Sequence, residues 1–276
     1  MKKIFKIIFN ILFLIILTCL LCIGIYFIRK SENIEEKIED TKIEDTYDEW
    51  YFHNSDDEEL LKKYQDYNDD VVGIIRINDS VLNHPMVQTK EEEDYYLYRD
   101  LDKKYNSHGV PLLSANSEIE KFGSNMVVYG HNINIHTRDI FADLNYYEDI
   151  KYYKTHPYIE TISKSGTRRW LIFAYFITDN SDHNPFRYSD YTNFTSKEQF
   201  DSYISEVDKR NWIDIKVPIE YGDTLITLSS CSRELAGSGT NRMVVMGKLI
   251  RTTDDYTKEI NNSAGNQNPV LPEKLQ

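Results

Sequence analysis

The hydrophobic pattern of the chain changes character at two places. Residues 7–28 form an apolar run without a charged side chain, residues 31–70 are rich in charge, and from residue 71 short apolar runs alternate with turn residues. About 20 apolar residues are enough for a helix to cross a bilayer. We therefore expect a transmembrane anchor at residues 7–28, preceded by a cytoplasmic end at residues 1–6.

The flanks of this run indicate how the anchor is inserted. No small-residue cleavage pattern follows the run, which favours an uncleaved signal anchor over a removed signal peptide. Three lysines precede the run, whereas Arg29 and Lys30 follow it, so the positive-inside bias is slight. We expect a single-pass protein of the cell membrane, with the N-terminus inside and the bulk of the chain extracellular.

Residues 29–70 are expected to form an acidic juxtamembrane stalk. Between residues 31 and 70 there are 16 acidic and 4 basic side chains, a net charge of −12 out of −13 for the chain. Ser55 and Glu58 have the spacing of a capping box, and an apolar stripe at helical spacing follows, which predicts a helix there. Since the remainder is nearly neutral, the basic surface that binds nucleic acid is absent from the pattern.

Residues 71–252 read as one mainly β domain. Short runs rich in β-branched and aromatic residues are separated by turn residues, and no helices alternate with them, which argues against a doubly wound α/β sheet. The runs number eight: VVGIIRI, HPMVQ, GVPLLSA, NMVVYGH, RRWLIFAYFI, IDIKVPI, DTLITLSSC and RMVVMGKLI. Eight strands in about 180 residues suggest a closed or nearly closed all-β domain.

Two segments depart from this pattern. More than forty residues separate IFAYFI from DTLITL, and they contain a predicted helix with Thr195 and Glu198 at capping-box spacing. A connection of that length is usually functional or adds a packing element. Residues 253–276 are polar and are expected to be a disordered tail.

Cys231 ends the run DTLITLSSC and is the only cysteine outside the first 22 residues. In strand register Cys231 shares a face with Thr227 and Ser229, whereas Ile226 and Leu228 share the other face. No disulfide can form within the extracellular part, so the thiol is either buried or reactive. Its place on the more polar face favours reactivity only slightly.

A thiolate nucleophile needs a proton-transfer partner, most often histidine. Of the seven histidines, His131 is distinct because it ends the strand-like run NMVVYGH, after Gly130, which permits close backbone approach. His136 lies five residues further on in a loop, and a pair without a third ligand is weak evidence for a metal site. His131 is therefore the candidate partner of the cysteine.

Acyl transfer also requires a group that stabilises the oxyanion. Arg233 follows Cys231 closely, and Arg242 opens the run RMVVMGKLI after the loop ELAGSGTN. If the two flanking strands pair antiparallel, Cys231 and Arg242 lie side by side. The glycine-containing loop has little β-propensity, so Arg233 is expected to turn to solvent.

These features together resemble the sortases, specifically class B, in TLSSC, YGHN and the arginine that opens the next strand. The resemblance extends from about residue 71 to residue 251, with VVGIIRI, HPMVQ, DYYLYRDLDKKYNSHGV and the helix-bearing insertion, and it includes the N-terminal signal anchor of these Gram-positive surface enzymes. One difference is Ser230, directly before the cysteine, where threonine is frequent in these enzymes. The resemblance implies an eight-stranded sortase-type β-barrel with an N-terminal helix and a helix in the long loop before the cysteine strand.

The resemblance also implies roles for particular residues. Cys231 would be the nucleophile, His131 the acid/base and Arg242 the oxyanion or substrate donor, with Ser229 and Ser230 as substrate contacts. The implied enzyme cleaves a C-terminal sorting motif of a secreted protein through a thioacyl intermediate and joins that protein to an amine of the cell-wall peptide in peptidoglycan. No metal or organic cofactor and no nucleic acid is implied.

Two other functions fit the same residues. A cysteine endopeptidase would resolve the intermediate with water, and a non-catalytic surface-anchored binding module would merely bury Cys231. In the sortase interpretation, the insertion between residues 178 and 221 is expected to line the cleft and to contribute to substrate choice.

Overall fold

The computed structural model describes residues 49–132, 139–183, 185–231 and 241–276. One compact unit, Trp50–Gln276, contains almost all of them, so it begins well before the expected boundary at residue 71. The expected anchor at residues 7–28 lies outside the described residues. Within the described ranges, no helix has both the length and the apolar character needed to cross a bilayer.

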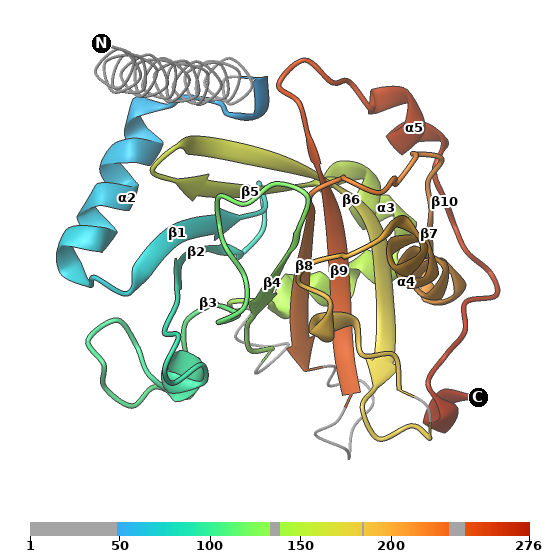
Figure 1. The fold of residues 1–276 in the computed structure, drawn as a ribbon, viewed down its shortest axis with the longest axis horizontal. Helices are drawn as coiled ribbons and strands as arrows, with labels where there is room; N and C mark the ends of the chain where they lie inside the picture. The colour runs from blue at the N-terminus through green and yellow to red at the C-terminus, as the bar shows by residue number, and fades with distance from the viewer. Residues whose placement is uncertain (1–48, 133–138, 184, 232–240) are drawn as a thin grey trace, which may run out of the picture. The chain divides into compact units, whose positions relative to one another are not determined.

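In the described part, eight strands close into a barrel, and β5 pairs with β1 to complete it (Figure 1). In spatial order they are β1 (Val71–Arg76), β2 (Asn83–Val87), β3 (Leu112–Leu113), β4 (Asn125–Tyr129), β8 (Leu225–Cys231), β9 (Asn241–Ile250), β6 (Gly166–Asp179) and β5 (Tyr158–Ser163). The prediction of a mainly β protein built on an eight-stranded barrel is confirmed.

One of the eight predicted strands is nevertheless misplaced. The run IDIKVPI supplies only β7 (Ile213–Asp214), which pairs with β10 (Ala264–Gly265) outside the barrel. The eighth barrel strand is β5, which the sequence pattern did not reveal. In a sequence, the charged residue Glu160 suggests an exposed position, but in β5 its side chain is buried.

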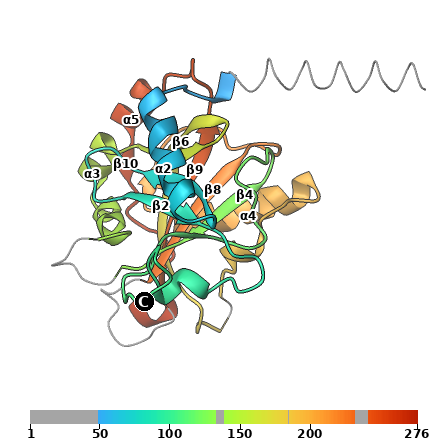
Figure 2. The ribbon, with the colours of Figure 1, turned by 90° about the vertical axis from the view of Figure 1, so that its left-hand side faces the viewer.

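Buried ion pairs explain why β5 tolerates this charge. The Glu160 carboxylate accepts hydrogen bonds from Arg76 on β1 and from Arg169 on β6, at 2.8 to 3.0 Å. The second guanidinium edge of Arg76 binds Asp57 of the helix α2 (Ser55–Tyr67). A buried charge is tolerated when it is paired and hydrogen-bonded, and this network joins α2 to the barrel wall. Figure 2 shows the ribbon of α2 in front of the barrel strands.

Both faces of β8 are covered. Ile226 and Leu228 belong to the apolar cluster inside the barrel, whereas Leu225 belongs to a second cluster with Phe200 and Tyr203 of α4 (Lys197–Arg210). The more polar face of β8 is therefore also buried, beneath the long insertion.

The helix starts differ from the prediction by one residue. Asn54, rather than Ser55, caps α2 by accepting the N–H of Asp56. Ser196, rather than Thr195, caps α4 by accepting the N–H of Gln199. In each case adjacent polar residues can accept the same kind of hydrogen bond, which a sequence pattern does not distinguish.

The segment expected to be a disordered tail has regular structure. It contains α5 (Thr257–Asn262), β10 and a 3₁₀ turn, η4 (Glu273–Leu275). Ile260 is buried, and backbone hydrogen bonds join Val270 to Lys209 and Asn266 to Trp212. A few apolar and backbone contacts thus hold a segment whose overall composition is polar.

Four short elements complete the described part of the fold: η1 (Tyr95–Tyr98), η2 (Ala142–Glu148), α3 (Ile150–Thr155) and η3 (Tyr188–Asp190). Among these, η1 lies in the connection between β2 and β3, and η3 lies in the insertion between β6 and α4. Both contribute side chains to the cleft described next.

Candidate active site

Three neighbouring strands bring the predicted residues to one end of the barrel. β4 runs parallel to β8 with Tyr129 opposite Ser229, and β9 runs antiparallel to β8 with Arg242 opposite Cys231. β4 ends at Tyr129, two residues before His131, and β8 ends at Cys231, two residues after Ser229, so both residues lie at the same end of these strands. The predicted side-by-side position of Cys231 and Arg242 is confirmed by this register.

Backbone and hydroxyl contacts fix the end of β4 against β8. The N–H of Gly130 donates to the Ser229 carbonyl at 3.1 Å, and the Ser230 hydroxyl donates to the Gly130 carbonyl at 2.7 Å. A residue with a side chain would not fit at Gly130, because its Cβ would lie 2.7 to 2.9 Å from the Phe141 ring. The position of His131 therefore follows from close packing at the preceding glycine.

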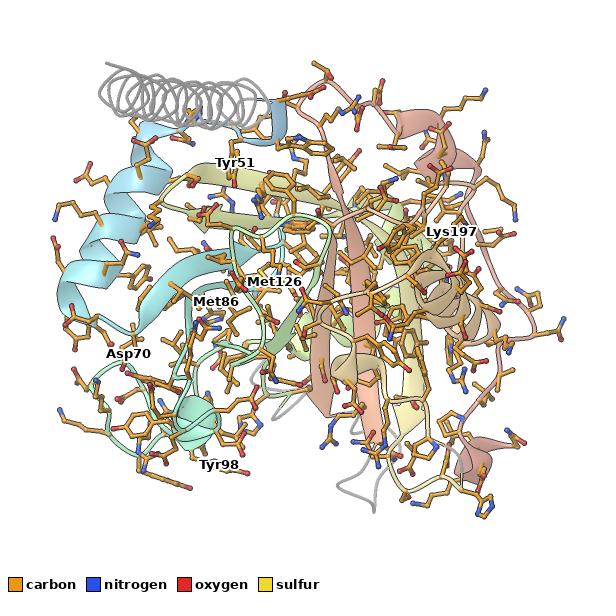
Figure 3. The ribbon with its side chains drawn as sticks, viewed as in Figure 1. Tyr51, Asp70, Met86, Tyr98, Met126 and Lys197 are labelled. Carbon is orange, nitrogen blue, oxygen red and sulfur yellow. The ribbon has the colours of Figure 1, made fainter. Side chains whose placement is uncertain are left out.

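His131 is held through its ring and its carbonyl. Its Nε2 lies 2.7 Å from the carbonyl oxygen of Leu97 in η1, and its ring centroid lies 5.2 Å from that of Tyr98. Figure 3 labels Tyr98 at this end of the barrel. A carbonyl can only accept, so Nε2 carries the proton and Nδ1 is the acceptor nitrogen of the neutral ring. The His131 carbonyl in turn accepts the N–H of Phe141 at 3.1 Å.

Arg242 is half-buried at the start of β9. Its Nη1 donates to the carbonyl of Asn241 at 3.0 Å, which orients one edge of the guanidinium along the strand. Arg233 and His136 lie outside the described residues, as does the side chain of Cys231. The described part of the site thus comprises the backbone of the cysteine and the whole of the other two candidates.

A cleft of about 600 Å³ opens over these strand ends. Side chains from β4, β8, β9, the η1 connection and the insertion line it: Glu93, Asp94, Leu97, Tyr98, Leu112, Tyr129, Gly130, His131, Asn180, Tyr188, Ser189, Ser229, Ser230 and Arg242. The cleft therefore brings His131 and Arg242 together with both predicted serine contacts.

The insertion forms one wall of the cleft, as expected, through Asn180, Tyr188 and Ser189. The Tyr188 hydroxyl and the Ser229 hydroxyl are hydrogen-bonded at 2.7 Å, and both residues are buried. Ser230 is equally buried and is bonded to Gly130. Contact of either serine with substrate stays a prediction.

The cleft lining also contains two acidic residues, Glu93 and Asp94, which the sequence pattern did not reveal. Glu93 accepts hydrogen bonds from the Ser114 hydroxyl and the Ala115 N–H, so its carboxylate is fixed in place. Burial raises the pKa of Tyr129 in the same cleft, while a hydrogen bond with Ser189 acts in the opposite direction. The phenol of Tyr129 is thus neutral at physiological pH, where it can donate a hydrogen bond.

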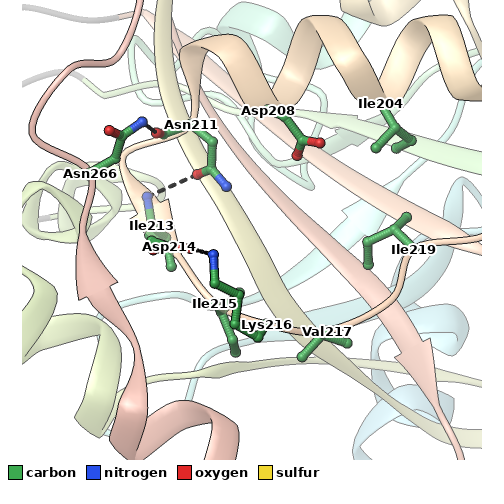
Figure 4. A pocket seen from close by; sticks show the side chains of 10 residues that line it. All are labelled: Ile204, Asp208, Asn211, Ile213, Asp214, Ile215, Lys216, Val217, Ile219 and Asn266. Atoms are coloured by element: carbon green, nitrogen blue, oxygen red, sulfur yellow. Dashed lines mark hydrogen bonds and ion pairs between the residues drawn. The ribbon is translucent and has the colours of Figure 1, made fainter.

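A second cleft, of about 550 Å³, lies between α4 and residues 213–219 (Figure 4). Its lining contains aliphatic residues with Asp208, Asp214 and Lys216, and it has no thiol or imidazole. The chemistry predicted from the sequence therefore belongs to the first cleft. Over the described residues, no group of three or more histidine, cysteine or carboxylate side chains is arranged to bind a metal ion.

No protein-family model matches the chain. Comparison with individual proteins, however, finds sortases of class B among its relatives. The chain is 26% identical over 205 residues to sortase B of Staphylococcus aureus, covering 70% of this chain and 80% of that protein. It is 29% identical over 197 residues to sortase B of Listeria monocytogenes, covering 71% of this chain and 76% of that protein.

A crystal structure of Staphylococcus aureus sortase B matches this fold with a TM-score of 0.61 at 26% identity, covering 70% of this chain and 87% of that structure. These likenesses identify the barrel as a sortase fold. Together with the two relatives, this likeness supports a class B sortase, that is, a cysteine transpeptidase.

Proposed function

We propose that this sortase attaches secreted proteins covalently to the cell wall, with Cys231, His131 and Arg242 as its catalytic residues. The observation that supports these roles most directly is that Arg242, the strand partner of Cys231 on β9, lines the same cleft as His131. Nucleophilic acyl transfer needs a nucleophile, a proton-transfer group and an oxyanion donor within reach of one carbonyl.

In the proposed reaction, the thiolate of Cys231 attacks the carbonyl carbon of a peptide bond in the sorting motif. The guanidinium of Arg242 donates to the oxyanion that develops, a role in which a fixed donor lowers the barrier strongly. The C–N bond then breaks, and the leaving amine takes a proton from His131. The product of this half-reaction is a thioester between Cys231 and the sorted protein.

The second half-reaction reverses these roles. An amine of the cell-wall peptide gives up a proton to His131 and attacks the thioester carbonyl, which restores the Cys231 thiolate and forms a new peptide bond. The hydrogen bond from Nε2 to the Leu97 carbonyl assigns this proton transfer to Nδ1. A single nitrogen thereby serves as acid in one half-reaction and as base in the other.

The substrates are proposed from what related proteins bind. One solved structure is a complex of Staphylococcus aureus sortase B with its substrate, and another sortase B structure is a complex with triglycine. By analogy we propose that the acyl donor here is a C-terminal sorting motif. The proposed acceptor is an amine of the cell-wall peptide in peptidoglycan.

The N-terminal segment would place this reaction at the cell surface. The apolar run at residues 7–28 supports a single-pass membrane anchor with the N-terminus inside. Protease added to intact protoplasts should then degrade the region from Trp50 onward, whereas protection of that region would contradict the orientation.

The proposed function predicts transfer rather than hydrolysis when an amine is present. Purified protein is incubated with a library of sorting-motif peptides, with and without triglycine, and the products are identified by mass spectrometry. We expect an acyl fragment joined to triglycine. Hydrolysed fragments alone would indicate a cysteine endopeptidase, and no cleavage of any library member would support a binding module.

Arg242→Lys is expected to lower turnover by about two orders of magnitude, the scale of removing one oxyanion donor. Lysine keeps the charge but lacks the planar fork of the guanidinium, so it donates in a different geometry. Arg233→Ala is the matched control and should cost less than about tenfold, as for a solvated surface charge. The measurement is the initial rate of both variants on one fluorogenic peptide. If Arg233→Ala is the more impaired variant, the oxyanion donor has been assigned to the wrong arginine.

A further inference from the structure

The chain makes a strained turn shortly after His131. Ile140 is buried and has a positive φ of 52°, a backbone conformation that β-branched residues strongly disfavour. Its N–H donates to Oδ1 of Asp139 at 2.8 Å. The next residue, Phe141, donates its N–H to the carbonyl of His131 and packs its ring against Gly130. Strain of this kind persists only where surrounding contacts enforce it, and it is frequent at functional sites.

Asp139 also reaches across to the connection that carries η1. Its Oδ2 accepts a hydrogen bond from Nδ1 of His108 at 2.6 Å, and its Oδ1 lies 3.5 Å from Nε2 of His84 on β2. Burial lowers the pKa of His84, and the Asp139 charge opposes that shift. One carboxylate thus joins the strained turn to two histidines that are far from it in sequence.

The connection that carries His108 also holds the acceptor for His131. Gly109 has a positive φ of 62°, and a Cβ there would lie 2.5 Å from the Leu97 carbonyl oxygen. The backbone beside His108 therefore packs directly against the carbonyl that binds Nε2 of His131. A displacement of His108 would be transmitted to this acceptor.

These contacts close a ring around His131. Leu97 binds its imidazole, Phe141 binds its carbonyl, and the Asp139–His108 hydrogen bond joins the two segments that supply them. Without that bond, these two segments would be connected to each other at this point, among the described residues, only through their separate contacts with His131.

We propose that Asp139 is a positioning residue of this sortase, which acts through His108 to hold the imidazole of His131 in its proton-transfer orientation. The inference rests on the proposed role of His131. Misplacement of a reacting group by a fraction of an ångström to an ångström slows the chemical step more than it weakens substrate binding, because the cleft walls supplied by β4, β8, β9 and the insertion are unchanged.

The test compares kcat and KM of full-length Asp139→Ala and His108→Ala on a cleaved sorting peptide. We expect kcat to fall by about tenfold in each, with KM changed less than about twofold. His108→Asn should recover most of kcat, because its amide can donate from nearly the position of Nδ1. The double variant should be no slower than the slower single variant, since each single variant already removes the Asp139–His108 hydrogen bond.

Glu58→Gln is the matched control, because it alters another histidine–carboxylate contact, 3.9 Å from His53, away from the cleft. It should leave kcat within about twofold of the parent.

Folding is monitored by thermal unfolding. If Asp139→Ala does not fold, the comparison of His108→Ala with His108→Asn is the test. An unchanged kcat in folded variants, additive losses in the double variant, or a loss confined to KM would each overturn the proposal. If His131→Ala keeps full activity, the proposed function fails instead, independently of Asp139.

Discussion

Replacing Cys231 by alanine is expected to leave a folded protein that transfers no acyl group. Cys231 is the only cysteine after residue 22, and it is the residue of β8 that pairs with Arg242 at the cleft. Among the cleft residues, the hydroxyls of Ser229 and Ser230 are hydrogen-bonded to Tyr188 and to the Gly130 carbonyl, neither of which is a general base that would activate them. Loss of a catalytic nucleophile ordinarily lowers kcat by several orders of magnitude.

The measurement is the rate of acyl transfer to the amine of triglycine. Thermal unfolding of the parent and of the variant confirms that the variant is folded. The thioester intermediate gives a second readout, since intact mass of the parent protein after mixing with peptide should show an acyl adduct that the variant lacks. Residual transfer above about a hundredth of the parent rate would exclude Cys231 as the nucleophile.

Replacing His131 by alanine is expected to lower kcat by at least about a hundredfold, within the range of general acid–base contributions. The alanine variant also removes the hydrogen bond to Leu97, so His131→Gln is needed beside it. A glutamine amide can donate to the same carbonyl but cannot transfer a proton at neutral pH. Both variants should therefore be equally impaired if proton transfer is the role of the residue.

His53→Ala serves as the control, because that imidazole is exposed and lies outside the cleft. It should keep kcat within about twofold of the parent. Recovery of activity in the glutamine variant alone would show that the residue acts through its contact with Leu97. A fully active alanine variant would exclude His131 altogether.

The part of the site that follows from local pattern was predictable from the sequence. β8 and β9 are short apolar runs joined by a glycine-containing loop, so the opposition of Cys231 and Arg242 needed no tertiary information. The run that ends in His131 has the same local signature. Roles for these residues remain a hypothesis that the variants above will test.

Other features depend on distant contacts and gave no local signal. β5 was missed because Glu160 is neutralised by Arg76 and Arg169 from neighbouring strands, and a sequence pattern does not show a buried ion pair. The Leu97 carbonyl is a backbone atom, which every residue has, so its role as acceptor could not be anticipated. The Asp139–His108 hydrogen bond joins two residues that are 31 positions apart, so no local pattern indicates it.

The parallel pairing of β4 with β8 has a consequence for folding. Tyr129 and Ser229 are opposite each other although about a hundred residues separate them along the chain, and closing so long a loop has an entropic cost that local hairpins avoid. Pairs such as β5 with β6 are close in sequence and are expected to form first. The catalytic centre should then be among the last parts of the protein to assemble. During refolding from denaturant, enzymatic activity should return with the slowest spectroscopic phase, and an earlier return would contradict this order of events.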